Sequence, residues 1–176
     1  FFASYRIMES ILPKLLEKID NSKTVLVERK GMRGDEAKRI VKIMQEERNI
    51  VLFANMTGRF AEGVDLPGRA LETIILVGIP FERLTTRTTI YMEYYKELYG
   101  VEKGIFYSYV LPALRRAAQA MGRAIRSPRD KAIIIAADER YWEKRNMDLL
   151  PEYFKNNAVK TNLRDAINMI HGFQKE

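Results

Sequence analysis

The sequence has no cysteine and a single histidine, His171. The chain therefore forms no disulfide, holds no metal through thiolates and uses no cysteine nucleophile, and one histidine argues against a histidine-based metal site. Any catalysis must rely on carboxylates, arginines or a bound nucleotide.

Long hydrophobic runs are also lacking. No apolar stretch approaches the roughly 20 residues that a membrane-spanning helix needs. The opening FFASYRIMES has none of the charged, apolar and small-residue zones of a signal peptide. We therefore expect an intracellular protein without a membrane partner.

Size, composition and charge indicate a basic globular domain. The 176 residues suit one hydrophobic core, and 47% hydrophobic with 30% charged residues is typical of a soluble protein. The net charge of +7 favours polyanionic partners through a salt-sensitive attraction. Charge alone does not separate nucleic-acid binding from an ordinary basic surface.

Apolar runs alternate with helical patterns. Runs rich in β-branched residues predict strands of a parallel sheet at 23–30, 49–56, 72–81, 131–139 and, less clearly, 1–5. Helical patterns cover 6–19, 35–47, 85–126 (as two helices divided near Gly100 or Gly104, the second stopping at Ser127) and about 162–173. This order predicts a doubly wound α/β fold with ligands beyond the carboxyl ends of the strands.

The loop TGRFAEGVDLPG, residues 57–68, follows one predicted strand. Its glycines allow tight turns and close backbone approach, while Glu62 and Asp65 place carboxylates at the ligand edge of the sheet. Two other interpretations stay open: a surface turn whose acids cap the next segment, and a paired-carboxylate hydrolase.

The stretch QAMGRAIRSPRD, residues 119–130, combines small apolar residues with a narrow polar stripe. At helical spacing this stripe consists of Gln119, Gly122, Arg123 and Arg126. Buried arginines need anions. The anions are either internal acids, such as Glu62, Asp65 or Asp138, or a phosphate whose charge the guanidinium groups offset during transfer.

Together these segments resemble motifs of a known family. FFASYRIMES, TGRFAEGVDLPG and QAMGRAIRSPRD, in this order, resemble motifs IV, V and VI of superfamily 2 DNA helicases, in particular the XPD-like branch with its DinG relatives. The segments are called motifs IV, V and VI below. The resemblance implies a RecA-like three-layer domain with a mostly parallel sheet flanked by helices. It covers nearly the whole chain, 1–176, as one domain.

The resemblance also implies roles for individual residues. Such helicases bind ATP between two RecA-like domains, and motif VI of the second reaches the nucleotide on the first. Arg123 and Arg126 are then arginine fingers on the γ-phosphate, and Gln119 contacts or senses it. Residues near the nucleotide are Glu62, Gly63, Asp65 and Gly122. Residues facing single-stranded DNA are Ser4, Tyr5, Thr57 and Arg59.

Some family features are not in this sequence. It has no GxxxxGK phosphate loop, and DEAK at 35–38 opens a predicted helix instead of ending a strand. The cysteines of the family's iron-sulfur domain are lacking too. We therefore expect the second motor domain of a larger helicase, nearly inactive alone, with ATP and Mg²⁺ bound mainly by the first domain and the iron-sulfur cluster held elsewhere in the parent protein.

The implied function is a 5′ to 3′ DNA helicase with single-stranded DNA and the N-terminal RecA-like half as partners, active in DNA repair in a eukaryotic nucleus or a prokaryotic cytoplasm. The alternative is a basic α/β module that binds single-stranded nucleic acid without ATP, motivated by the charge and by aromatic residues at 90–100 and 105–109. A nucleotide-binding metabolic enzyme is disfavoured because no GxGxxG follows a strand.

Overall fold

The computed structural model describes residues 1–64, 71–125, 127 and 129–173. Within them the strands are β1 (Thr24–Val27), β2 (Ile50–Phe53), β3 (Thr73–Val77) and β4 (Ile133–Ala137). β1 pairs with β2 and β3 pairs with β4, both in parallel. All lie inside the predicted runs, so these strands are confirmed, although each is shorter than its apolar run.

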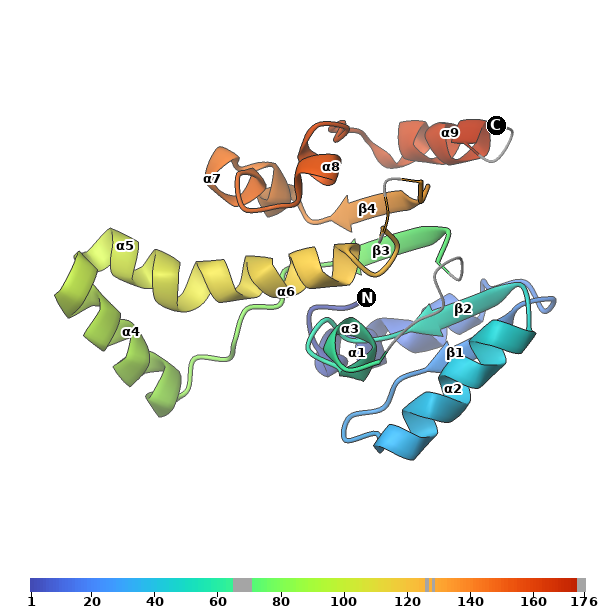
Figure 1. Cartoon of the computed structure of the whole chain (residues 1–176), viewed down its shortest axis with the longest axis horizontal. Helices are drawn as coiled ribbons and strands as arrows, with labels where there is room; N and C mark the ends of the chain where they lie inside the picture. The colour runs from blue at the N-terminus through green and yellow to red at the C-terminus, as the bar shows by residue number, and fades with distance from the viewer. Residues whose placement is uncertain (65–70, 126, 128, 174–176) are drawn as a thin grey trace.

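The N-terminal segment joins the two strand pairs. Phe2 forms isolated parallel bridges with Asn55 beyond β2 and with Val77 of β3. Its backbone N–H donates to the Ala54 carbonyl at 2.8 Å, and Ala3 N–H donates to the Val77 carbonyl at 2.9 Å. The predicted strand at 1–5 is thus reduced to a bridge, which lies between β2 and β3 (Figure 1).

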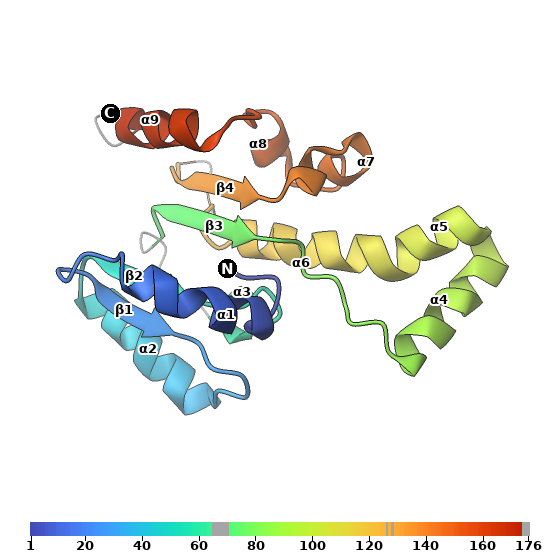
Figure 2. The same ribbon diagram turned by 180° about the vertical axis from the view of Figure 1, so that it is seen from behind.

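Helices flank this sheet on both faces. Their bounds are α1 (Tyr5–Leu16), α2 (Gly34–Glu46), α3 (Arg59–Glu62), α4 (Thr86–Tyr99), α5 (Val101–Ile105), a π-helical turn η1 (Phe106–Val110), α6 (Leu111–Met121), a 3₁₀ turn η2 (Glu139–Trp142), α7 (Lys144–Met147), α8 (Glu152–Lys155) and α9 (Leu163–Phe173). Figure 1 and the reverse view in Figure 2 show α1 on one face and α2, α3 and α6 on the other. The predicted RecA-like three-layer α/β architecture is confirmed.

Alternate strand residues form the cores of the two faces. Val25 and Val51 pack with α1 around Met8, whereas Leu26 and Leu52 pack with α2 and α3 around Phe60. α6 covers the second strand pair through small and apolar residues that pack against Ile74 and Leu76: Ala113, Leu114, Ala117, Ala120 and Met121. None of the described helices is both long and apolar enough to cross a bilayer.

The predicted helix pair at 85–126 is confirmed in outline. The chain reverses at Gly100, whose φ of 80° favours glycine, and a Cβ on Gly104 would lie 2.5 Å from the Lys96 Cα. These glycines let α4 and α5 cross closely. The resulting hairpin projects beyond the sheet (Figures 1 and 2).

The end of the second helix differs from the prediction. α6 stops at Met121, where the backbone hydrogen bonds change from four-residue to three-residue spacing. Arg123 N–H donates to the Ala120 carbonyl at 3.2 Å, and Ala124 N–H donates to the Met121 carbonyl at 3.3 Å. The predicted continuation to Ser127 is wrong. Consequently Gln119 lies on the helix, Gly122 caps it and Arg123 follows in a turn, so the expected helical stripe does not form.

Leu76→Ala and Ile75→Ala test the orientation of β3. Leu76 is fully buried under α6, whereas Ile75 is 46% exposed on the opposite face. Leu76→Ala should lower the free energy of unfolding by about 2–5 kcal/mol through lost burial and a cavity, and Ile75→Ala by about 1 kcal/mol. Urea denaturation of both variants measures the difference. Equal losses would contradict the assigned orientation of the two side chains.

Candidate functional site

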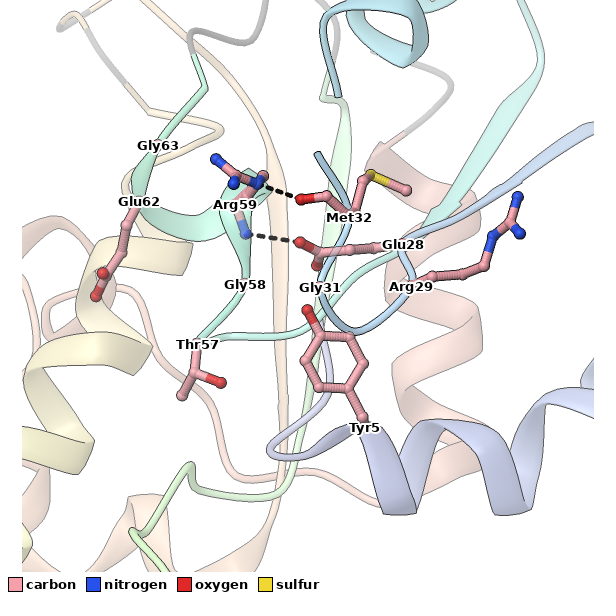
Figure 3. Close-up of a pocket in the computed structure, with 10 residues that line it drawn as sticks. All are labelled: Tyr5, Glu28, Arg29, Gly31, Met32, Thr57, Gly58, Arg59, Glu62 and Gly63. Atoms are coloured by element: carbon pink, nitrogen blue, oxygen red, sulfur yellow. Dashed lines mark hydrogen bonds between the residues drawn. The ribbon is translucent and has the colours of Figure 1, made fainter. Parts of the chain in front are cut away.

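A cleft of about 410 Å³ opens where β1 and β2 end, beside the start of α1. Its lining comes from motif IV, motif V and the segment after β1: Tyr5, Glu28, Arg29, Gly31, Met32, Thr57, Gly58, Arg59, Glu62 and Gly63 (Figure 3). The cleft therefore gathers residues for which sequence analysis expected separate nucleic-acid and nucleotide roles.

A buried carboxylate, Glu28, organises the base of this cleft. Glu28 directly follows β1, and its side chain is only 1% exposed. Its Oε1 accepts a hydrogen bond from the Arg59 N–H at 2.6 Å, and its Oε2 accepts one from the Asn55 N–H at 2.8 Å. These charge-assisted bonds fix both ends of the turn that begins motif V.

No pattern in the sequence singled out Glu28 as a site residue. Its partners lie 27 and 31 residues away in the chain, beyond any local pattern. The available signal was its position: an acid that ends an apolar strand lies at the edge of the sheet where ligands bind.

Gly58 is required by the same carboxylate. A Cβ built on Gly58 would lie 2.3 Å from the Glu28 Oε2 and 2.4 Å from its Oε1. Real Cβ atoms do not approach oxygen so closely. Glycine at this position therefore lets the motif V turn close over Glu28.

Motif IV contributes Tyr5 to the cleft and Ser4 to its support. Ser4 Oγ accepts a hydrogen bond from the Ile7 N–H at 3.2 Å, so Ser4 caps the N-terminus of α1. Burial and, after it, the neighbouring Glu28 carboxylate together raise the pKa of Tyr5 to about 12. The phenol thus stays neutral at physiological pH.

Thr57 and Arg59 are held by hydrogen bonds within the site. Thr57 donates from its backbone N–H (2.8 Å) and its hydroxyl (2.6 Å) to the Asn55 Oδ1. The Arg59 Nε donates to the Met32 carbonyl at 2.5 Å. Both side chains remain exposed, so they can reach a ligand in the cleft.

Motif VI meets motif V at the other end of α3. The Arg123 Nε donates to the Ala61 carbonyl at 2.7 Å and its Nη1 donates to the Val64 carbonyl at 3.0 Å, while its Nη2 also bonds to the Ala61 carbonyl. The guanidinium thus binds carbonyls at the C-terminal end of a helix, where the backbone carries partial negative charge.

The remaining predicted residues are placed as follows. Glu62 and Gly63 line the cleft beside the expected DNA-facing residues, whereas Gln119 and Gly122 do not. Asp138, considered above as an internal anion, binds its neighbour Arg140 at 2.6 Å, and this bond lowers the pKa of Asp138. Asp65 and Arg126 lie outside the described residues.

Metal ligands are not grouped in the part of the chain that the structure describes, where no three His, Cys, Asp or Glu side chains come together to hold an ion. The site instead offers the exposed guanidinium groups of Arg29 and Arg59 beside an open cleft. Such donors suit an anionic, phosphate-bearing ligand.

Comparison with known proteins identifies relatives. A family model described as the helicase C-terminal domain matches residues 1–157. The XPD/RAD3 helicase subunit of general transcription and DNA repair factor IIH from Saccharomyces cerevisiae is 28% identical over 177 residues, covering 96% of this chain and 22% of that protein. A probable ATP-dependent helicase from Methanocaldococcus jannaschii is 30% identical over 188 residues, covering 99% of this chain and 28% of that protein.

Solved structures agree in fold. A structure of XPD helicase superposes with a TM-score of 0.69 at 23% identity, covering 92% of this chain and 28% of the other. A structure of XPD in its apo form gives a TM-score of 0.65 at 25% identity, covering 92% and 31%. The chain thus spans about a fifth to a third of the proteins that it matches.

Gly58→Ala and Gly34→Ala test the close packing at Glu28. Gly58→Ala should destabilise the fold by about 1–3 kcal/mol, because the new methyl group must displace the Glu28 carboxylate or the motif V turn. Gly34→Ala is the control, since a Cβ there meets nothing within 4 Å. Urea denaturation compares the two. A Gly58→Ala variant as stable as Gly34→Ala would show that the carboxylate is not packed against the turn.

Proposed function

The chain belongs to the family of helicase C-terminal domains and is of the XPD type, and from this membership we propose that it is the second motor domain of an ATP-dependent DNA helicase. In the intact protein it would complete an ATP site formed with a first RecA-like domain and would grip single-stranded DNA. The names of its XPD relatives, which are subunits of a general transcription and DNA repair factor, support a role in DNA repair.

The observation that carries this proposal is the position of α3 between two sets of functional residues. One side of this short helix borders the cleft with Tyr5, Thr57 and Arg59. Arg123 of motif VI binds the Ala61 carbonyl of this helix and the Val64 carbonyl just after it. A single rigid turn of helix therefore connects the proposed DNA grip with the proposed ATP contact.

On the DNA side, the cleft supplies donors for a phosphate backbone. Thr57 and Arg59 are exposed, and the neutral Tyr5 ring can pack against a sugar or base. Ser4 would act through α1 by capping the helix that carries Tyr5. Such contacts would hold DNA independently of its sequence.

On the ATP side, Arg123 and Arg126 are proposed arginine fingers, with Gln119 contacting the γ-phosphate. Arginine fingers stabilise charge that develops on the transferred phosphoryl group. Glu62, Gly63, Asp65 and Gly122 would lie near the nucleotide. The Arg123 guanidinium is half-buried, so part of it is accessible to a phosphate.

Other parts of the site must come from outside this chain. The sequence has no phosphate loop with its lysine, so the first domain would cradle ATP and Mg²⁺. Without cysteine, this chain offers no ligand to an iron-sulfur cluster, which would be bound elsewhere in the parent protein. The first RecA-like domain is thus the necessary partner.

Steady-state ATP hydrolysis by the full-length protein tests the proposal, with and without single-stranded DNA. DNA should stimulate the wild type, and Arg123→Ala or Arg126→Ala should lower the stimulated turnover by on the order of 10³-fold. The control is Arg115→Ala, an exposed arginine on α6, which should hydrolyse ATP at the wild-type rate.

DNA affinity and unfolding should be measured on the same variants, because Arg123 also supports α3. Lost turnover with retained DNA affinity and stability indicates a phosphate contact. Wild-type turnover in both arginine variants would contradict the finger assignment. DNA binding without any DNA-stimulated hydrolysis by the wild type would favour the ATP-independent binding module.

A further inference from the structure

A tight turn after β1 forms one wall of the cleft. The Met32 N–H donates to the Arg29 carbonyl at 3.0 Å, and Gly31 between them has a φ of 76°. A glycine with positive φ at the third position of a four-residue turn is typical of type II turns. The turn exposes Arg29 and Lys30.

Both ends of this turn are anchored in the site. Before the turn, the buried Glu28 carboxylate accepts hydrogen bonds from the backbone of motif V. After it, Met32 is 7% exposed in the core under α2, and its carbonyl accepts the Arg59 Nε. Because each anchor reaches motif V, the backbone that carries the two exposed cations has a fixed position beside it.

The charges along the cleft are arranged unevenly. Figure 3 shows Arg29 on the side of Tyr5 and Met32, with its side chain directed away from Arg59, and Glu62 on the opposite side of Arg59. The Glu28 carboxylate is buried and directed toward backbone N–H groups. Arg33, beyond the turn, forms an ion pair with Asp35 at 3.2 Å. The exposed charge on the Arg29 side is therefore positive.

We propose that the turn Arg29–Met32 is an additional nucleic-acid contact, in which Arg29 and Lys30 bind phosphates of the single-stranded DNA held by motifs IV and V. This inference rests on the proposed function and extends it, because the resemblance assigns no DNA contact to this turn. Glu28 is the positioning residue that holds both walls together.

The test is the salt dependence of DNA binding by the full-length protein, measured by fluorescence anisotropy with labelled oligothymidine. Arg29→Ala/Lys30→Ala should reduce the slope of log affinity against log salt by about 1.4, since each single-strand phosphate contact contributes roughly 0.7. The control, Lys38→Ala/Arg39→Ala, removes two exposed cations of α2 that belong neither to the turn nor to the lining of the cleft. Its slope should stay near that of the wild type.

The comparison separates a phosphate contact at the turn from a general effect of surface charge. Equal slopes for the two double variants would overturn the proposed contact, because surface charge alone would then explain the effect. Arg59→Ala serves as the reference for the motif V contact. If Arg59→Ala weakens binding while Arg29→Ala/Lys30→Ala does not, this inference fails and the proposed function stands. If the wild type does not bind the oligonucleotide, both fail.

Discussion

The arrangement of the site depends on one buried carboxylate. A carboxylate taken out of water costs several kcal/mol unless donors surround it, and Glu28 is satisfied by the Asn55 and Arg59 N–H groups. These bonds join the end of β1 to the turn after β2. Gly58 lets that turn close, and Tyr5 packs beside it. The shape of the cleft therefore depends on the backbone hydrogen bonds that the Glu28 carboxylate accepts.

The short helix α3 extends this constraint to motif VI. Its N-terminal backbone is held by Glu28, and its last carbonyls accept hydrogen bonds from Arg123. Because α3 is a single turn from Arg59 to Glu62, a shift of its C-terminal carbonyls moves its N-terminal end as well. In the proposed motor, exchange of Arg123 between these carbonyls and a phosphate would change the position of motif V, and with it the grip on DNA.

The strands and most of the helices could be predicted from the sequence, because hydrophobic periodicity is a local signal. The family resemblance was likewise visible in three short segments of the chain. The sequence did not predict the end of α6, since Ala124 and Ile125 continue the apolar pattern beyond Met121. The backbone hydrogen bonds there already follow the three-residue spacing of a 3₁₀ turn. The partners of Glu28 and Arg123 were also hidden, because they are backbone groups 27 to 62 residues away. Asp138, an expected anion for the arginines, binds the nearby Arg140.

Amide hydrogen exchange of Asn55 and Arg59, measured by NMR in the wild type and in Glu28→Gln, tests the central role of Glu28 most directly. A glutamine keeps the shape of the side chain but presents an NH₂ group toward one of the two N–H donors. At least one of these amides should exchange about tenfold faster or more, because an unmet buried hydrogen bond costs about 1–3 kcal/mol. The amides of β3 should keep their rates. Unchanged exchange at both Asn55 and Arg59 would contradict the account.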